Sequence, residues 1–116
     1  MRDDDRLYLR HMCDHARKAC ELIAGKHRSD FEADEVLRLA LSYLVQIIGE
    51  AANHVSQGTR QAHAEIPWRD IVGMRHRLVH GYFEVDEDIV WQTVTTELGP
   101  LVATLDGILG SSNRSN

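Results

Sequence analysis

The sequence contains few of the residues that interrupt helices or cross-link chains. It has two prolines, two cysteines and 6% aromatic residues among 116, and most of its eight glycines fall near expected helix ends. This scarcity favours an all-α domain over a β-rich one. No run approaches the roughly 20 apolar residues that a membrane-spanning helix needs, and the N-terminus does not resemble a signal peptide. We therefore expect a cytoplasmic protein with no membrane segment.

The two cysteines are expected to be reduced thiols. Cys13 and Cys20 are seven positions apart on one predicted helix, which separates them by about 10 Å along its axis. That distance is too long for a disulfide within the helix. Two thiols in a reducing compartment are favoured over a structural disulfide.

The periodicity of the apolar residues predicts four main helices. They cover residues 3–24, 29–55, 66–80 and 86–109. Residues 56–65 are predicted as a polar connection. We expect an antiparallel up-and-down bundle of these helices over residues 1–110, with a disordered tail over residues 111–116.

Local signals mark where these helices begin and end. Gly25 and Gly81 are predicted to end the first and third helices, and the pair Ser29 and Glu32 has the spacing of a capping box for the second. Asp86 is the predicted N-cap of the fourth. The dipeptide at 99–100, Gly-Pro, is expected to kink that last helix.

Positive charge is confined to one short segment. The net charge of −5 excludes a globally basic nucleic-acid-binding protein. Residues 69–80, by contrast, contain three arginines and two histidines against one aspartate. A local RNA site is therefore expected in this segment.

Arg75 and His80, five positions apart, supply the groups that metal-free RNA cleavage requires. RNA carries its own nucleophile, the 2′-hydroxyl, so cleavage needs a proton acceptor, a proton donor and a cation on the phosphate. Histidine titrates nearest neutral pH and serves as acid or base. Arginine presents a planar fork that matches two phosphate oxygens.

The predicted helix places these groups on different faces. Residues five apart on a regular helix point about 140° away from one another, so Arg75 and His80 do not share a face, whereas His76 and His80 do. A single copy would therefore form a poor site. A two-fold homodimer would bring two sets of these side chains into one cleft.

Residues 66–86 resemble the hallmark segment of HEPN-domain ribonuclease toxins of the HepT type, with Arg75, His80 and Tyr82 as their R-x4-H-x-Y motif. Further matches at 47–51 and 90–100 extend the resemblance over residues 31 to about 105. The resemblance implies an antiparallel helical bundle and a homodimer with the motif at its cleft. It also implies a metal-independent endoribonuclease that is the toxin of a type VII toxin–antitoxin system.

The resemblance also implies a role for each motif residue. Arg75 would hold the phosphate of the RNA substrate, and His80 would be the catalytic histidine. Tyr82 would be AMPylated by the partner, an MntA-type minimal nucleotidyltransferase antitoxin.

Three further residues are expected to support the site. His76 occupies a position that is usually asparagine in the family, and Glu50 matches a recurrent glutamate facing the same cleft. Arg77 adds positive charge beside them. We expect no metal and no cofactor.

Other interpretations of the same residues remain open at the level of sequence. Arg75, His76 and Arg77 are also compatible with a solvated helix face. His76 and His80 have the i, i+4 spacing of metal ligands, but they lack the adjacent glutamate of a zinc hydrolase, and neighbouring arginines repel a cation. The alternative function is a non-catalytic nucleotide- or RNA-binding module that serves a partner nucleotidyltransferase, and a plain helical scaffold is a weaker one.

Overall fold

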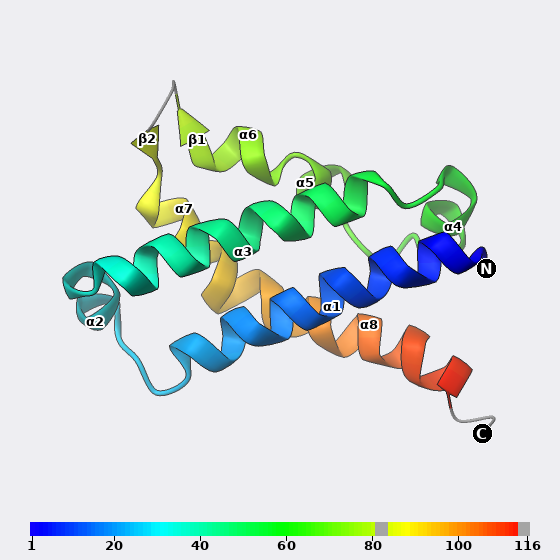
Figure 1. Ribbon diagram of the computed structural model, residues 1–116, viewed down its shortest axis with the longest axis horizontal. Helices are drawn as coiled ribbons and strands as arrows, with labels where there is room; N and C mark the ends of the chain where they lie inside the picture. Colours follow the sequence, from blue (N-terminus) through cyan, green and yellow to red (C-terminus); the bar gives the residue numbers. More distant parts are fainter. Residues whose placement is uncertain (81–83, 114–116) are drawn as a thin grey trace.

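The structure is a computed structural model that describes the backbone of residues 1–80 and 84–113 and the side chains of residues 1–79 and 84–110 (Figure 1). Two strands, β1 (Val79–His80) and β2 (Glu84–Val85), form a short antiparallel pair. The helices are α1 (Asp3–Ile23), α2 (Arg28–Ala33), α3 (Glu35–Asn53), α4 (Gln57–Ala62), α5 (Trp68–Val72), α6 (Met74–Leu78), α7 (Glu87–Gln92), the π-helical turn η1 (Thr93–Glu97) and α8 (Leu98–Asn113).

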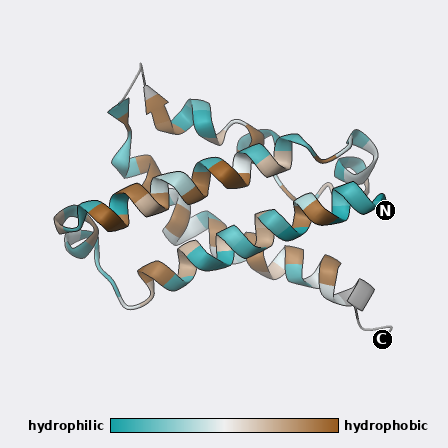
Figure 2. Ribbon diagram, viewed as in Figure 1, coloured by the Kyte–Doolittle hydropathy of each residue, from teal (hydrophilic) through white to brown (hydrophobic). Residues whose placement is uncertain are grey.

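These elements form an antiparallel up-and-down bundle, which confirms the predicted all-α fold. α1 and α3 run side by side in opposite directions, α5 and α6 lie along α3, and α7 to α8 return along α1 (Figure 1). Figure 2 shows that α3 is apolar along most of its length, whereas α1 is largely hydrophilic. Large side chains from three helices, including Leu9, Leu41 and Leu105, are fully buried between them. None of the described helices is long and apolar enough to cross a membrane.

The predicted second helix is divided into α2 and α3. The side chain of Asp34 accepts a hydrogen bond from the Leu37 N–H at 3.0 Å, which gives α3 a start of its own. The prediction of a capping box at Ser29 is wrong, because α2 already begins at Arg28. Its first turn is closed instead by the His27 N–H, which donates to the Asp30 carboxylate at 2.7 Å.

The predicted third helix is shorter than expected and contains a break. It begins at Trp68, is interrupted at Gly73 and ends at Leu78. The prediction that Gly81 ends a helix running through His80 is therefore wrong. The chain enters β1 because Val79 pairs with Val85 and the Asp86 N–H donates to the carbonyl oxygen of Leu78 at 2.6 Å. His80 thus lies in a strand.

The last helix begins as predicted, and a π-helical turn interrupts it before the predicted kink at 99–100. The Asp86 carboxylate accepts a hydrogen bond from the Ile89 N–H at 3.1 Å, which confirms the N-cap. The widened turn η1 precedes Pro100, whose ring lacks an N–H and crowds the carbonyl group of residue 96. α8 runs to Asn113.

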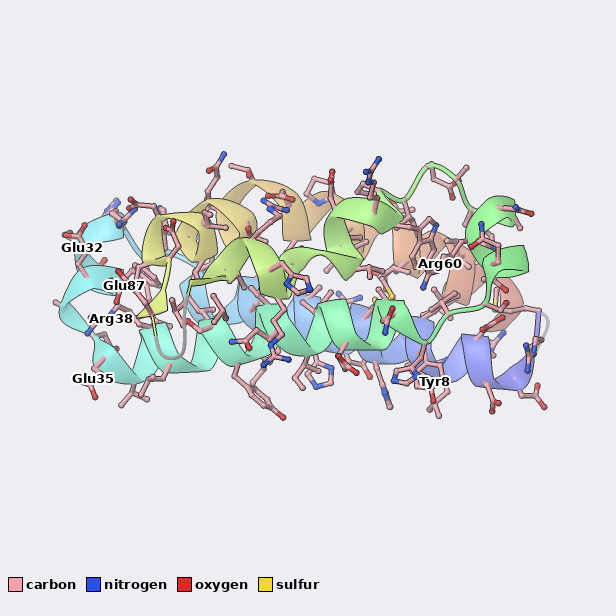
Figure 3. The ribbon with its side chains drawn as sticks, turned by 90° about the horizontal axis from the view of Figure 1, so that it is seen from above. Tyr8, Glu32, Glu35, Arg38, Arg60 and Glu87 are labelled. Atoms are coloured by element: carbon pink, nitrogen blue, oxygen red, sulfur yellow. The ribbon has the colours of Figure 1, made fainter. Side chains whose placement is uncertain are left out.

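Charged side chains fasten one end of the bundle. Arg38 of α3 forms an ion pair with Glu87 of α7 at 3.2 Å and donates hydrogen bonds to the carbonyl oxygens of Phe31 and Glu32. Figure 3 shows Glu32, Arg38 and Glu87 together at this end, away from Tyr8 and Arg60. Arg38 therefore holds α2 and α7 against the start of α3.

A buried carboxylate fastens the opposite end. Asp5 of α1 is 2% exposed and accepts hydrogen bonds from the Ser56 N–H (2.8 Å), the Ser56 hydroxyl (2.5 Å) and the Thr59 hydroxyl (2.7 Å). Burial alone would raise the pKa of Asp5, but these hydrogen bonds outweigh it and hold the pKa below its usual value. The ionised carboxylate therefore ties the first turn of α1 to α4.

Candidate active site

A groove of about 1160 Å³ lies between α3 and the α5–α6 pair. Its ionisable lining residues are Arg60, Arg69, Arg75, His76 and Glu50. Three permanent positive charges against one carboxylate make it locally basic, although the chain as a whole carries a net charge of −5. We call this feature the basic groove. It is the kind of surface that holds a phosphate backbone.

The walls of the basic groove approach closely because α3 has a glycine where α5 crosses it. A Cβ atom at Gly49 would lie 2.8 Å from the carbonyl oxygen of Ile71, well inside normal contact. Ile71 and Met74 are buried at this crossing, at 2% and 1% exposure. The side chain of Met74 packs in the interior, whereas Arg75 and His76, which follow it, line the groove.

Arg75 and His76, two of the predicted site residues, lie side by side in the groove. Both side chains are exposed and line it. Within residues 1–79 and 84–110, no hydrogen bond or ion pair engages either side chain. Their donors are therefore available to an anionic ligand.

Glu50 also lines the groove, and its carboxylate contacts a histidine. Its carboxylate lies 3.6 Å from His54 Nε2, one turn further along α3. The ring of His54 in turn stacks on Tyr8 of α1 at 4.9 Å. Figure 3 shows Tyr8 on the side of α3 away from Arg60. Glu50 thus sits at the rim, between the groove and this aromatic contact.

Arg77, expected to support the site, does not line the groove. Its guanidinium is 3.3 Å from the carboxylate of Glu97 on η1. This contact joins α6 to the last helical segment of the bundle. The contact of Arg77 is therefore structural: it holds α6 against η1.

The two remaining motif residues lie at the hairpin. The backbone of His80 is in β1, one residue beyond Val79, which lines the groove. The side chain of His80 and all of Tyr82 lie outside the described residues. Because His80 is in a strand, the 140° separation from Arg75 expected on a continuous helix does not apply.

The groove also includes residues that the sequence did not single out. Arg60 of α4 donates hydrogen bonds to the carbonyl oxygens of Val55 (3.0 Å), Ala52 (3.1 Å) and Asn53 (3.1 Å), at and just beyond the end of α3. Its guanidinium also lies 5.9 Å from the centre of the Trp68 ring. Residues 56–65 were predicted as a polar connection with one short helical turn starting at Thr59. α4 spans six residues of this connection and has no apolar stripe that would mark it as part of a site.

In the part of the chain that the structure describes, no group of three or more histidine, cysteine, aspartate or glutamate side chains lies close enough to hold a metal ion. The polar side chains that line the groove are those of arginine, histidine, glutamate and the carboxamide residues.

Comparison with known protein families decides the assignment of this site. The family model described as "Ribonuclease HepT-like" matches residues 12–108. This chain belongs to the HepT-like ribonuclease family. Membership confirms the resemblance carried by residues 66–86 and supports an RNA-cleaving enzyme.

Individual relatives agree with this HepT-like assignment. A protein of Caldanaerobacter subterraneus subsp. tengcongensis, named "Putative RNase TTE0752", is 36% identical over 104 residues, covering 90% of this chain and 93% of the relative. "Probable ribonuclease HepT" of Thermococcus cleftensis is 38% identical over 72 residues, covering 62% and 66%. No solved structure matches this chain.

Proposed function

We propose that this protein is a metal-independent endoribonuclease and the toxin of a type VII toxin–antitoxin pair. The observation that carries the proposal is the exposed guanidinium of Arg75, which forms no hydrogen bond or ion pair with the described side chains, in the basic groove of a HepT-like ribonuclease. His80 follows in β1, directly after Val79, which lines that groove.

In the proposed reaction, His80 removes the proton from a ribose 2′-hydroxyl. The 2′-oxygen attacks the adjacent phosphorus, and the bond from phosphorus to the 5′-oxygen of the next nucleotide breaks. That oxygen leaves with a proton from a second acid, for which we propose His80 of the partner subunit. Arg75 binds two non-bridging oxygens, whose negative charge grows in the transition state. The products are a 2′,3′-cyclic phosphate and a 5′-hydroxyl.

The proposed homodimer has a suitable contact surface on α3. Val36, Leu39 and Tyr43 are 76%, 63% and 61% exposed, and their spacing places them along one face of the helix. The same face continues to Glu50 at the groove rim. We call Val36, Leu39 and Tyr43 the α3 stripe. A second copy packed on this stripe would remove apolar surface from water and bring the two basic grooves together.

The catalytic part of the proposal is tested with purified protein and total RNA in the presence of EDTA. We expect Arg75→Ala and His80→Ala each to lower the cleavage rate by at least about 100-fold, with cyclic phosphate ends on the wild-type products. Arg10→Ala, which removes an exposed arginine of α1, is the matched control. Full cleavage by the His80→Ala variant would refute the mechanism. RNA binding without new fragments would favour the non-catalytic alternative.

The dimer is tested by adding charge to the α3 stripe. Leu39→Lys together with Tyr43→Lys should convert the protein to a monomer in analytical ultracentrifugation and abolish cleavage. Leu7→Lys changes an exposed leucine of α1 (49% exposed) and serves as control. A monomeric variant with full activity would contradict the shared site.

Neutralisation by an MntA-type nucleotidyltransferase is proposed at Tyr82. AMP units on a residue two positions from His80 would add negative charge beside the groove and repel the RNA backbone. The Tyr82 peptide should gain the mass of whole AMP units only when the partner is co-expressed. Tyr82→Phe should stay toxic to cells and escape the partner. Neutralisation of the Tyr82→Phe variant would exclude this site.

A further inference from the structure

We propose that the end of the basic groove formed by α4 is a nucleobase-binding subsite that selects a nucleotide close to the cleaved bond. Gln57 and Gln61 are its base-reading residues. The inference rests on the proposed ribonuclease function and extends it to the recognition of sequence in single-stranded RNA.

Carboxamide side chains are concentrated in this groove. Four line it: Gln46, Asn53, Gln57 and Gln61. Gln46 donates a hydrogen bond to the Ser42 carbonyl oxygen at 3.2 Å. Within the described side chains, no hydrogen bond engages the amides of the other three. Their donors and acceptors are available to a ligand.

Carboxamides suit bases better than phosphates. A phosphate accepts hydrogen bonds only, and the three groove arginines already supply donors for it. A carboxamide presents a donor beside an acceptor, which matches the paired groups on the edge of a base. The division of the lining between arginines and amides therefore fits a ligand with both a phosphate backbone and bases.

The two glutamines are held on a rigid support. Gln57 and Gln61 are four positions apart on α4, so they share one face of the helix. Arg60, between them, is fixed by three hydrogen bonds to the end of α3. The start of α4 is fixed by the two hydrogen bonds that Ser56 donates to the Asp5 carboxylate. Such support limits the motion of the reading residues, which sharpens selection between ligands.

The chemistry also specifies the form of the RNA. In an RNA helix the major-groove edges of the bases lie in a deep, narrow groove that side chains do not reach, and the accessible minor groove is recognised mostly by shape, so base reading favours an unpaired strand. Adenine is the usual partner of a glutamine that makes two hydrogen bonds. We expect adenine to be favoured at one position within a few nucleotides of the cut.

The experiment compares the wild-type protein with the double variant Gln57→Met and Gln61→Met. Methionine keeps the length and helix preference of glutamine but removes the amide. A synthetic RNA with a randomised 12-nucleotide centre is cut, and the product ends are sequenced. We expect wild type to favour adenine by between about 5-fold and 100-fold at one position, and the double variant to lose this preference while still cutting. Gln92→Met, on α7 outside the groove, should behave like wild type.

The outcomes separate the subsite from the ribonuclease proposal. Cleavage with no base preference, or with a preference that the double variant retains, overturns the subsite and leaves the ribonuclease in place. A preference for another base that the variant abolishes supports the subsite. If wild type cuts no RNA, the ribonuclease proposal fails. Fluorescence anisotropy with adenine-only and uracil-only 8-mers then decides the subsite: a difference in affinity that depends on Gln57 and Gln61 supports it, and equal binding refutes it.

Discussion

Replacing Gly49 with alanine would force apart the two walls of the basic groove. The added Cβ would lie 2.8 Å from the Ile71 carbonyl oxygen, whereas ordinary contact begins at 3.4 Å. α5 must therefore move by about 0.6 Å, the difference between these distances. The obstacle is a backbone atom, so rotation of a side chain does not relieve it.

Two opposing effects set the stability of this variant. Overpacking of a tight contact costs about 1–3 kcal/mol, while alanine gains about 1 kcal/mol over glycine inside a helix. Gly107→Ala on α8 is the matched control, because a Cβ there meets nothing within 4 Å. Both variants gain the same helix preference of alanine over glycine, so this gain cancels in the difference between their free energies of unfolding. That difference should equal the overpacking cost, about 1–3 kcal/mol, with Gly49→Ala the less stable.

Urea unfolding followed by circular dichroism measures this difference, and the cleavage rate reports on the site. Because α6 follows α5 directly, the shift is transmitted to Arg75. We expect a loss of cleavage on the order of 10-fold, since small displacements of a positioning group are costly. If Gly49→Ala were as stable and as active as Gly107→Ala, the close crossing of α3 and α5 would not position the groove.

Three further predictions concern charge and burial. Asp5→Ala leaves three hydrogen-bond donors without their acceptor and should lower the unfolding free energy by about 2–4 kcal/mol at pH 7. Because the pKa of Asp5 is lower in the folded state, its stabilisation is present above the unfolded pKa of about 3.9 and is lost as pH falls through the folded value; urea unfolding from pH 3 to 7 should show it. Single-stranded RNA binding should weaken with salt with a log–log slope of about −2 for three groove arginines, and Arg75→Ala should reduce that slope by about 0.7 in anisotropy titrations. Burial raises the pKa of the thiols of Cys13 and Cys20, so iodoacetamide should label both slowly at pH 7 until the protein is unfolded, as followed by mass spectrometry.

Sequence alone predicts those parts of the fold whose causes are local. α1 ends next to Gly25, which has a φ of 75° that glycine adopts without strain. The carboxylate of Asp86 caps the last helical segment as its position suggested. In each case the deciding contact lies within a few residues of the helix end, so a short stretch of sequence contains all the information.

The hairpin after α6 has a non-local cause, and the sequence did not predict it. The apolar pattern continues through Val79, so it indicates a helix up to His80. The backbone leaves the helix because Val79 pairs with Val85 and Leu78 accepts from Asp86 across the turn. Helix periodicity contains no information on such pairing.

The residues of the candidate site also differ in whether local sequence or the packing of distant segments determines their position. Arg75 and His76 were predicted as site residues because they belong to a contiguous motif, and both line the basic groove. Arg77 was grouped with them by position, yet its contact with Glu97 depends on how η1 packs against α6. Gln57 and Gln61 become part of a groove only when α4 packs near α5 in the fold. No local sequence pattern therefore identifies them as groove residues.

The contact of Asp5 with α4 has a practical consequence for handling this protein. Asp5, in the first turn of α1, stabilises the side of the groove that carries Gln57 and Gln61. Some 70 residues separate Asp5 from Arg75 in the sequence. Trimming the leading residues, or crowding them with a bulky fusion, would loosen that side from a distance. If such a variant were inactive, the cause would be the lost contact between Asp5 and α4. The reacting groups themselves would be intact.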